Sequence, residues 1–247
     1  MKPFFPFLLA LPLFAASLTA HADMIYGLYA DADAWRYDNQ LEVAQAGTQK
    51  QPFKGDTQTA AAIQLAIEHP LPFVPNIKLR YVPIELNAHT NTAAFVFNNT
   101  PYTGSVDLSL SAKQTDLILY YELLDNIVSV DAGIAAKQLK GDITVSNLIT
   151  KDRIVFNETL PLVYLAASVK LPFTGLSVNA EGTGIQYQGS SLSDLKAEIR
   201  YDLVKTLPMD IGLKLGYRKQ NINLKDIEHT DAKLDVKGPY LGLGIHF

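Results

Sequence analysis

The side chains best suited to chemistry form an alternating series of charges in the last third of the chain. Asp194, Lys196, Glu198, Arg200 and Asp202 occupy every second position, with apolar or aromatic residues between them. A period of two places all five charges on one face of a β-strand. On an enclosed face they can pair with one another, because a buried charge without a partner is costly, or they can line a narrow hydrated pore. We favour a structural ion-pair network over a pore.

Other predicted strands carry charges at the equivalent inward positions. Acids and bases among them are nearly balanced, as expected for ion pairs that bridge an inner wall. Lys137 shares their parity. The predicted inward network consists of Lys78, Arg80, Glu122, Asp131, Asp194, Lys196, Glu198, Arg200, Asp202, Lys214 and Arg218.

The histidines are the other candidates for chemistry. His89 and His229 fall in predicted loops, and His229 lies near Glu228 and Asp231, a trio that could bind a metal ion or activate water. A solvated loop is the simpler interpretation, because adjacent Glu and His residues do not fix a geometry. The sequence shows no nucleophile elbow, phosphate-binding loop, two-His metal spacing or Ser with a suitably placed His. It therefore predicts a protein that is not an enzyme and uses no metal or cofactor.

The elements that must hold these charges begin after an export signal. Lys2 provides a positive charge, residues 4–18 are mostly apolar, and Ala20-His21-Ala22 fits the small-x-small cleavage pattern. We predict a signal peptide at 1–22, cleaved after Ala22, and one domain at 23–247. No later stretch approaches the apolar length of a transmembrane helix.

The C-terminal segment indicates where the exported chain resides. Leu241, Leu243, Ile245 and Phe247 alternate with less apolar residues up to the last position. A terminal strand with an apolar face suits an outer-membrane barrel, whose last strand closes against its first and faces lipid. The spacing also resembles the assembly signal of such barrels, carried here by Tyr240, Gly242, Ile245 and Phe247.

The pattern of alternation predicts an all-β, antiparallel transmembrane β-barrel of ten strands, with 8–12 possible. Short periplasmic turns are expected at 70–76, 125–126, 171–175 and 206–209, and long external loops at 38–57, 88–101, 140–155 and 221–232. The apolar residues change from even-numbered to odd-numbered positions between Ala112 and Thr115, and again at Gly238-Pro239. We interpret both changes as β-bulges.

Composition is consistent with this class. The 247 residues include no cysteine, so stability does not depend on disulfides. The net charge of −4 argues against a nucleic-acid partner. The expected partners are outer-membrane lipid and lipopolysaccharide, and, in transit, periplasmic chaperones and the barrel assembly machinery.

Three phrases together resemble a known family. They are Glu68-His69-Pro70 with Pro72, Pro75 and Asn76; the segment 120–126, Tyr-Tyr-Glu-Leu-Leu-Asp-Asn; and Gly238-Pro239-Tyr240-Leu241-Gly242 with Phe247. The chain looks like a member of a family of small proteobacterial outer-membrane β-barrel proteins of largely unassigned function. The resemblance covers the mature chain and implies fold and location, but no catalytic residue.

The leading prediction is an integral, porin-like outer-membrane barrel of a Gram-negative cell with a narrow charged interior. Its role would be either structural or the binding of a small solute or ligand. One alternative is a hydrolase similar to the omptin proteases, which have ten strands and use Asp and His near the external rim. Another is a soluble periplasmic carrier of a lipophilic ligand, similar to lipocalins. The carrier requires apolar inward faces, and the charges at 194–202 argue against it.

Overall fold

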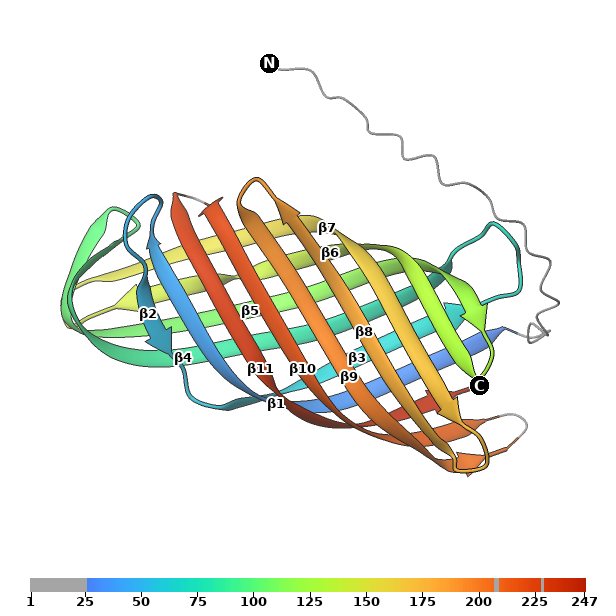
Figure 1. Ribbon diagram of the computed structural model, residues 1–247. Helices are drawn as coiled ribbons and strands as arrows, with labels where there is room; N and C mark the ends of the chain where they lie inside the picture. The colour runs from blue at the N-terminus through green and yellow to red at the C-terminus, as the bar shows by residue number, and fades with distance from the viewer. Residues whose placement is uncertain (1–25, 207–208, 228) are drawn as a thin grey trace, which may run out of the picture.

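The computed structural model describes residues 26–206, 209–227 and 229–247, so the predicted signal peptide lies outside the described residues. The described chain is all-β (Figure 1). No described segment forms a helix with the length and apolar character needed to cross a membrane. The strands are β1 (Gly27–Gln45), β2 (Gln51–Lys54), β3 (Gln58–Glu68), β4 (Asn76–Phe97), β5 (Thr100–Asp125), β6 (Val128–Ser146), β7 (Lys151–Leu171), β8 (Leu176–Tyr187), β9 (Ser190–Lys205), β10 (Asp210–Ile227) and β11 (Thr230–His246).

Ten of these strands close into one antiparallel barrel, which confirms the predicted fold class. Neighbours follow the order β1, β3, β4 and so on to β11, which then pairs with β1. The short β2 pairs with β1 on the same edge as β3, beyond the point where the pairing with β3 stops. At the closure, the Leu28 amide donates to the Phe247 carbonyl at 3.0 Å and the Phe247 amide donates to the Leu28 carbonyl at 2.9 Å. The chain therefore closes the barrel with its final residue.

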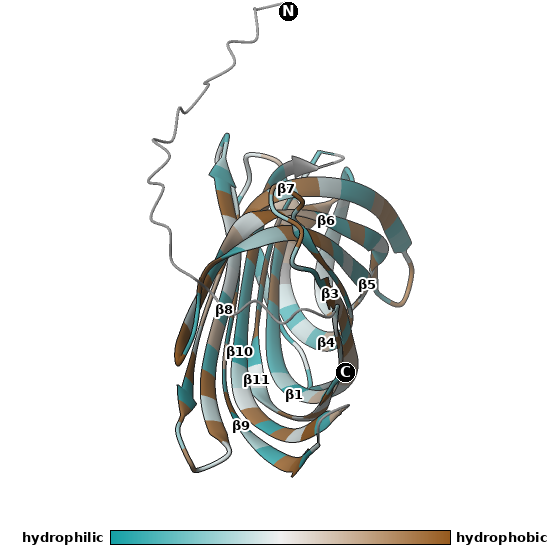
Figure 2. Ribbon diagram, turned by 90° about the vertical axis from the view of Figure 1, so that its right-hand side faces the viewer, coloured by the Kyte–Doolittle hydropathy of each residue, from teal (hydrophilic) through white to brown (hydrophobic). Residues whose placement is uncertain are grey.

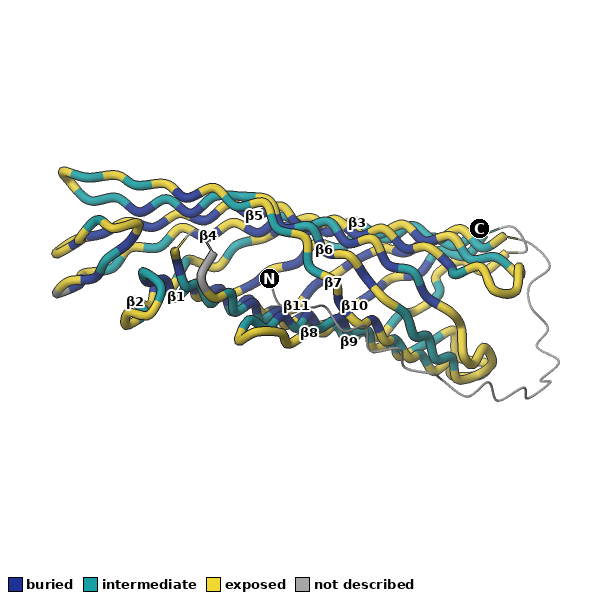
Figure 3. Tube along the Cα trace, turned by 90° about the horizontal axis from the view of Figure 1, so that it is seen from above, coloured by how far each residue is buried: buried dark blue, intermediate teal, exposed yellow. Residues whose placement is uncertain are grey.

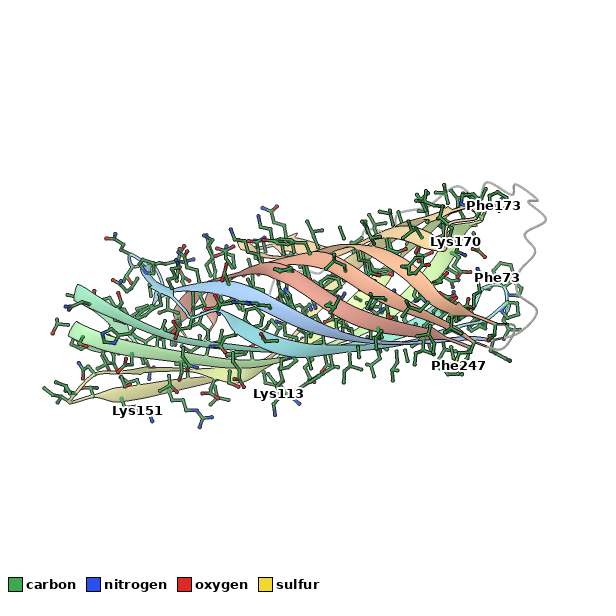
Figure 4. All side chains as sticks on the ribbon, turned by 90° about the horizontal axis from the view of Figure 1, so that it is seen from below. Phe73, Lys113, Lys151, Lys170, Phe173 and Phe247 are labelled. Atoms are coloured by element: carbon green, nitrogen blue, oxygen red, sulfur yellow. The ribbon has the colours of Figure 1, made fainter. Side chains whose placement is uncertain are left out.

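Each strand alternates between an outward and an inward face (Figure 3). Over one part of the barrel the outward residues are apolar and exposed, and we call this zone the belt. Phe73 and Phe173, in the short turns next to the belt, are both fully exposed at positive φ (67° and 65°), and they lie with Phe247 at one end of the molecule (Figure 4). Belt residues include Leu28, Ile63, Leu79, Leu117, Ile134, Leu165, Val178, Ile199, Leu215 and Leu241.

Beyond the belt the strands continue into a second zone, which we call the distal part. Its outward residues are mostly polar, beginning with Arg36, Glu85, Lys113, Lys219 and Lys237. Its inward residues are apolar, and they form a buried core like that of a water-soluble protein. The core includes Leu41, Ile84, Leu86, Leu108, Leu110, Leu139, Val145, Ile154, Leu192, Ile222 and Val236. The alternation of hydrophobic and hydrophilic positions along the ribbons is visible in Figure 2.

The predictions of a β-bulge between Ala112 and Thr115 and of another at Gly238-Pro239 are wrong. The shift in the apolar pattern there comes from the change between the belt and the distal part. Pairing of β5 with β4 and with β6 runs through Ala112 and Thr115 without a shift. Pairing of β11 with β10 likewise runs through Gly238 and Pro239 without a shift. Pairing of β11 with β1 is interrupted at these two residues but resumes in the same register, from Trp35 with Tyr240 to Asp38 with Lys237. The strands keep their orientation while their surroundings change. Apolar residues face outward in the belt and inward in the distal part.

Most of the residues predicted as long external loops are strand residues instead. The strands β1, β4, β6 and β10 extend to Gln45, Phe97, Ser146 and Ile227, far into the ranges 38–57, 88–101, 140–155 and 221–232. Asn98 and Asn99, with φ of 49° and 63°, make the two-residue turn between β4 and β5, as expected for Asn in a type I′ hairpin. Outward polar residues made these strands look like loops.

Candidate functional site

The interior of the belt contains a connected group of charged side chains, which we call the charged layer. At its centre, Asp194 on β9 accepts two hydrogen bonds from Arg218 on β10, from Nε at 2.8 Å and from Nη2 at 2.5 Å. Lys137 on β6 and Arg80 on β4 each place a nitrogen 3.6 Å from the same carboxylate. One acid thus joins cations from three strands.

A second acid, Asp116 on β5, completes the centre. Arg80 donates to its Oδ2 from Nε at 2.8 Å and from Nη2 at 2.6 Å, and Lys137 Nζ lies 2.7 Å from Oδ1. Asp116 was missing from the predicted network, although its parity relative to Leu117 and Leu119 was enough to place it inward. Lys137, which shares the parity of the network, is fully buried.

The charged layer spans the full width of the barrel. Gln114 on β5 and Gln220 on β10 exchange amide hydrogen bonds of 2.8 and 2.7 Å. In the ring of ten strands, β5 and β10 are five places apart, as are β4 and β9, which carry Arg80 and Asp194. Gln114 and Gln220 are 1% and 0% exposed. Side chains from opposite walls therefore meet and fill the interior at this level.

A neighbouring group extends the layer toward the short turns. Glu181 on β8, another residue absent from the predicted network, accepts from Lys78 Nζ at 3.0 Å and from Arg80 Nη1 at 2.5 Å. Lys78 also donates to the Tyr164 hydroxyl at 2.6 Å. These contacts join β4, β7 and β8 across the interior, so Lys78 and Arg80 both belong to one continuous arrangement.

On the opposite wall, Lys214 lies between two acids of β1. Its Nζ is 3.0 Å from Asp31 Oδ1 and 2.8 Å from Asp33 Oδ1. Gly242 is next to this site, and a Cβ atom added there would lie 2.0 Å from Asp33 Oδ1. The absence of a side chain at Gly242 therefore leaves room for the Asp33 carboxylate.

The remaining predicted network residues lie closer to the short-turn end. Glu198 accepts from the Tyr240 hydroxyl at 2.5 Å and lies 3.9 Å from Lys196, and Arg200 donates to Asp202 at 3.0 Å. Glu122 is exposed near the end of β5 and pairs in register with half-buried Asp131. The structure therefore places one part of the predicted set in the charged layer and another part at the rim.

The core of the distal part begins directly above the charged layer. A cavity of about 60 Å³ lies there, with Gln114 and Thr230 as its polar lining residues. Its apolar lining comes from β1, β5, β6, β7, β10 and β11, and none of it comes from β8 or β9, whose hairpin is shorter. The apolar lining residues are Leu41, Leu110, Ala112, Leu139, Ile143, Ile154, Phe156, Ile222, Leu224, Ala232 and Leu234.

Aromatic residues close another part of the distal core. Phe53 of β2 is fully buried and packs edge-on against Phe95, with ring centroids 5.6 Å apart; Phe95 in turn stacks on Tyr102. The Tyr102 hydroxyl donates to Asp152 at 2.8 Å. Burial raises the pKa of the Tyr102 phenol, and the hydrogen bond to Asp152 raises it further.

The predicted histidine positions have different outcomes. His229 lies in the turn between β10 and β11. Its neighbour Glu228 lies outside the described residues. His89 is a strand residue of β4, not a loop residue. Within the described part of the chain, His, Asp and Glu side chains form no group of three that could hold a metal ion.

The comparisons identify the fold. No family model matches the chain and no curated protein matches it. Among solved structures it is similar to the outer membrane protease OmpT of Escherichia coli, with 13% identity over 90% of this chain and 96% of that chain and a TM-score of 0.52. Neisserial surface protein A (11%, 89% and 95%, TM-score 0.32) and the Ail protein of Yersinia pestis (11%, 90% and 99%, TM-score 0.31) also match. At such identities the likeness shows the fold alone, that of an outer-membrane β-barrel.

Proposed function

We propose that this chain is an integral outer-membrane protein that does not conduct solutes and that functions through its distal part. The observation that carries this proposal is the contact between Gln114 and Gln220, which joins opposite walls within the charged layer. The buried ions around it are bonded to one another, which favours a structural role over catalysis or transport. This layer would stabilise the barrel from inside.

The belt supports placement in a bilayer. Its exposed apolar residues surround an interior of ion pairs, the arrangement that a transmembrane barrel requires. The short turns would lie in the periplasm, with Phe73 and Phe173 at the membrane interface, where aromatic side chains are favoured. The distal part, with polar residues outside and apolar residues inside, would then project outward from the cell. Export would use the signal peptide at 1–22.

Conductance measurements test the closed interior. The purified protein in planar bilayers should show no discrete current steps, whereas a porin reconstituted in parallel should show them. Because the native chain has no cysteine, single cysteines give a second measurement in liposomes. Gln220→Cys should resist a water-soluble thiol reagent, and Asp202→Cys, at the partly exposed rim, should react. Current steps or labelling at position 220 would overturn the proposal.

Two lysine pairs suggest how the protein contacts the outer leaflet. Lys113 on β5 pairs directly with Lys140 on β6, and Lys219 on β10 pairs directly with Lys237 on β11. All four are exposed and point outward next to the belt. Like charges directly opposite each other destabilise a sheet, so each pair is suited to an anion. Phosphate groups of lipopolysaccharide would lie at this level.

Lipopolysaccharide binding can be measured through stability. Added lipopolysaccharide should raise the temperature at which the folded barrel converts to the unfolded gel form, and salt should weaken the effect. The double variants Lys113→Ala/Lys140→Ala and Lys219→Ala/Lys237→Ala should lose much of this gain. Lys151→Ala, at the tip of β7 (Figure 4), is the control and should retain it. Equal gains in all variants would contradict the assignment.

A second candidate function is binding of a lipophilic molecule in the distal cavity. The cavity lining is almost entirely apolar, and none of it comes from β8 or β9. A volume of about 60 Å³ suits a narrow aliphatic group, since an apolar cavity that holds benzene has roughly 150 Å³. Ala112→Phe should fill the cavity and reduce binding of xenon or a short aliphatic alcohol, measured by NMR. Ser111→Phe places the same ring on the outer face and is the matched control.

A further inference from the structure

We propose that Ser105, His89 and Asp107 form a hydrolytic triad on the outer wall of the distal part, and that its substrate is a carboxylic ester with a small acyl group. His89 Nδ1 lies 2.8 Å from Asp107 Oδ1, and Ser105 Oγ lies 3.3 Å from His89 Nε2. This activity goes beyond the proposed function, which assigns no reaction to the distal part.

The two contacts determine the state of the imidazole. A carboxylate only accepts hydrogen bonds, so Nδ1 of a neutral His89 must carry the proton that binds Asp107. Nε2 is then unprotonated and faces the Ser105 hydroxyl as an acceptor. A base oriented by an acid and directed at a serine is the arrangement that activates a serine nucleophile. A distance of 3.3 Å is within the range expected before substrate binds.

The register of β4 and β5 holds the three side chains together. His89 is directly opposite Asp107, and Asn91 is directly opposite Ser105, without a shift at these positions. Ser105 and Asp107 are two residues apart on one strand and so share a face. The pairing that forms the hairpin thus fixes the triad, and no loop has to order to create it.

An open strand edge beside Ser105 provides donors for the developing oxyanion. The last pair between β5 and β6 is Asp107 with Ser146, so residues 100–106 of β5 have no strand partner on that side among the described residues. Along a strand, successive N–H groups point to alternate edges. Either the Ser105 amide or the Val106 amide therefore faces the open edge. Such donors can stabilise negative charge on a substrate oxygen.

The position of the triad restricts the substrate. The side chains of His89 and Asp107 are 63% and 70% exposed, and Ser105 is exposed as well. None of the three residues lines the distal cavity, so that cavity cannot hold a long acyl chain beside them. His89 is six residues beyond Pro83 of the belt, about 20 Å along the strand at ~3.3 Å per residue. An ester carried by a soluble molecule or a surface polysaccharide can reach Ser105, whereas acyl esters within the bilayer cannot.

The reaction would proceed in two balanced steps. Ser105 Oγ attacks the ester carbonyl as its proton passes to His89 Nε2, and the alcohol leaves with that proton, which gives an acyl-serine. Water then attacks the acyl group while His89 accepts a proton, and the carboxylic acid leaves as Ser105 regains its hydrogen. Asp107 stabilises the imidazolium in both steps. Water is the only co-reactant.

The test is covalent labelling of the full folded barrel in detergent. A fluorophosphonate probe should modify Ser105, located by peptide mass spectrometry, and p-nitrophenyl acetate should be hydrolysed. Ser105→Ala should abolish both signals, and His89→Gln should lower the hydrolysis rate 100-fold or more. Ser109→Ala, on the same face opposite Asn87, is the control and should leave both unchanged.

Because all three residues are exposed, the variants should retain the heat-modifiable migration of a folded barrel. Absence of a probe adduct on Ser105 in the folded wild type would overturn the proposal, as would equal hydrolysis by wild type and Ser105→Ala. Full activity in His89→Gln would exclude the triad mechanism in the same way.

Discussion

The guanidinium of Arg218 lies over the indole ring of Trp35, with its central carbon 4.9 Å from the ring centroid. The same guanidinium binds Asp194, and the indole Nε1 donates to the Gly238 carbonyl at 3.1 Å. Arg218 belongs to the charged layer and Trp35 to the apolar core of the distal part. Their contact marks the level at which the interior changes from ionic to apolar, and it is a favourable cation–π geometry.

Breaking the charged layer should destabilise the barrel. Asp194→Ala removes the acid shared by Arg218, Lys137 and Arg80, and loss of one partner of a buried ion pair typically costs about 3–5 kcal/mol. Urea unfolding in liposomes would measure the loss. The matched control is Asp142→Ala, which removes a partly exposed partner of the exposed Arg153 and should change stability much less. Equal effects of both variants would contradict a structural role for the layer.

The belt assignment predicts opposite outcomes for arginine at two outward positions. Ile199→Arg, within the belt, should destabilise the protein by about 2–4 kcal/mol in a bilayer. Val155→Arg is the control, because Val155 also faces outward but lies in the distal part. A surface substitution in water should change stability by about 0.5 kcal/mol or less. A large loss only at Val155 would reverse the proposed position of the membrane.

Gly242 should be intolerant of any side chain. A Cβ there would lie 2.0 Å from Asp33 Oδ1, so Gly242→Ala must displace the carboxylate from Lys214. Overpacking of this kind costs about 1–3 kcal/mol. The additional change Asp33→Ala removes the clashing atom, so a double-mutant cycle should show coupling between the two positions. Purely additive effects in liposome unfolding would show that the clash is not the cause.

Deletion of Phe247 should impair assembly. The deletion removes both backbone hydrogen bonds to Leu28 at the barrel closure, together with the terminal residue of the predicted assembly signal. The amount of heat-modifiable protein in the outer-membrane fraction is the measurement. Phe247→Leu keeps the backbone contacts, so comparison with the deletion separates closure from aromatic recognition. Normal assembly of the truncated chain would show that neither the backbone closure at Phe247 nor recognition of its aromatic ring is needed.

One protease can test orientation, because chymotrypsin has sites at both ends. Leu148 is fully exposed at the tip of the β6–β7 hairpin, and Phe73 and Phe173 are fully exposed in the short turns. Intact cells should be cut at Leu148 and at Tyr187, which is exposed at the tip of the β8–β9 hairpin on the same side, and not at Phe73 or Phe173. Cells with a permeabilised outer membrane should also be cut at the two phenylalanines. Cleavage of intact cells at Phe73 or Phe173 alone would invert the topology.

The sequence by itself determined the fold class, the number of strands in the barrel and the relative facing of residues within each predicted strand, but not how far the strands extend. Asp194 and Lys196 alternate with Leu195 and Ala197, and a period of two requires that they share a face. The same rule gave Lys78, Arg80, Lys214 and Arg218 a common inward side. Parity is a local property of the backbone, so no tertiary information was needed.

Only the tertiary structure decided which face of each strand is apolar in the belt and in the distal part, and which residues meet across the interior. Leu110 and Leu119 lie on opposite faces of one unbroken strand, β5. Leu110 faces the buried core of the distal part, whereas Leu119 faces outward in the belt, because the apolar face of the strand changes from inside to outside between the two zones. Sequence reasoning attributed that change to a bulge. The meeting of Gln114 with Gln220 and of Ser105 with His89 depends on barrel closure and hairpin register, which join residues that no local pattern relates.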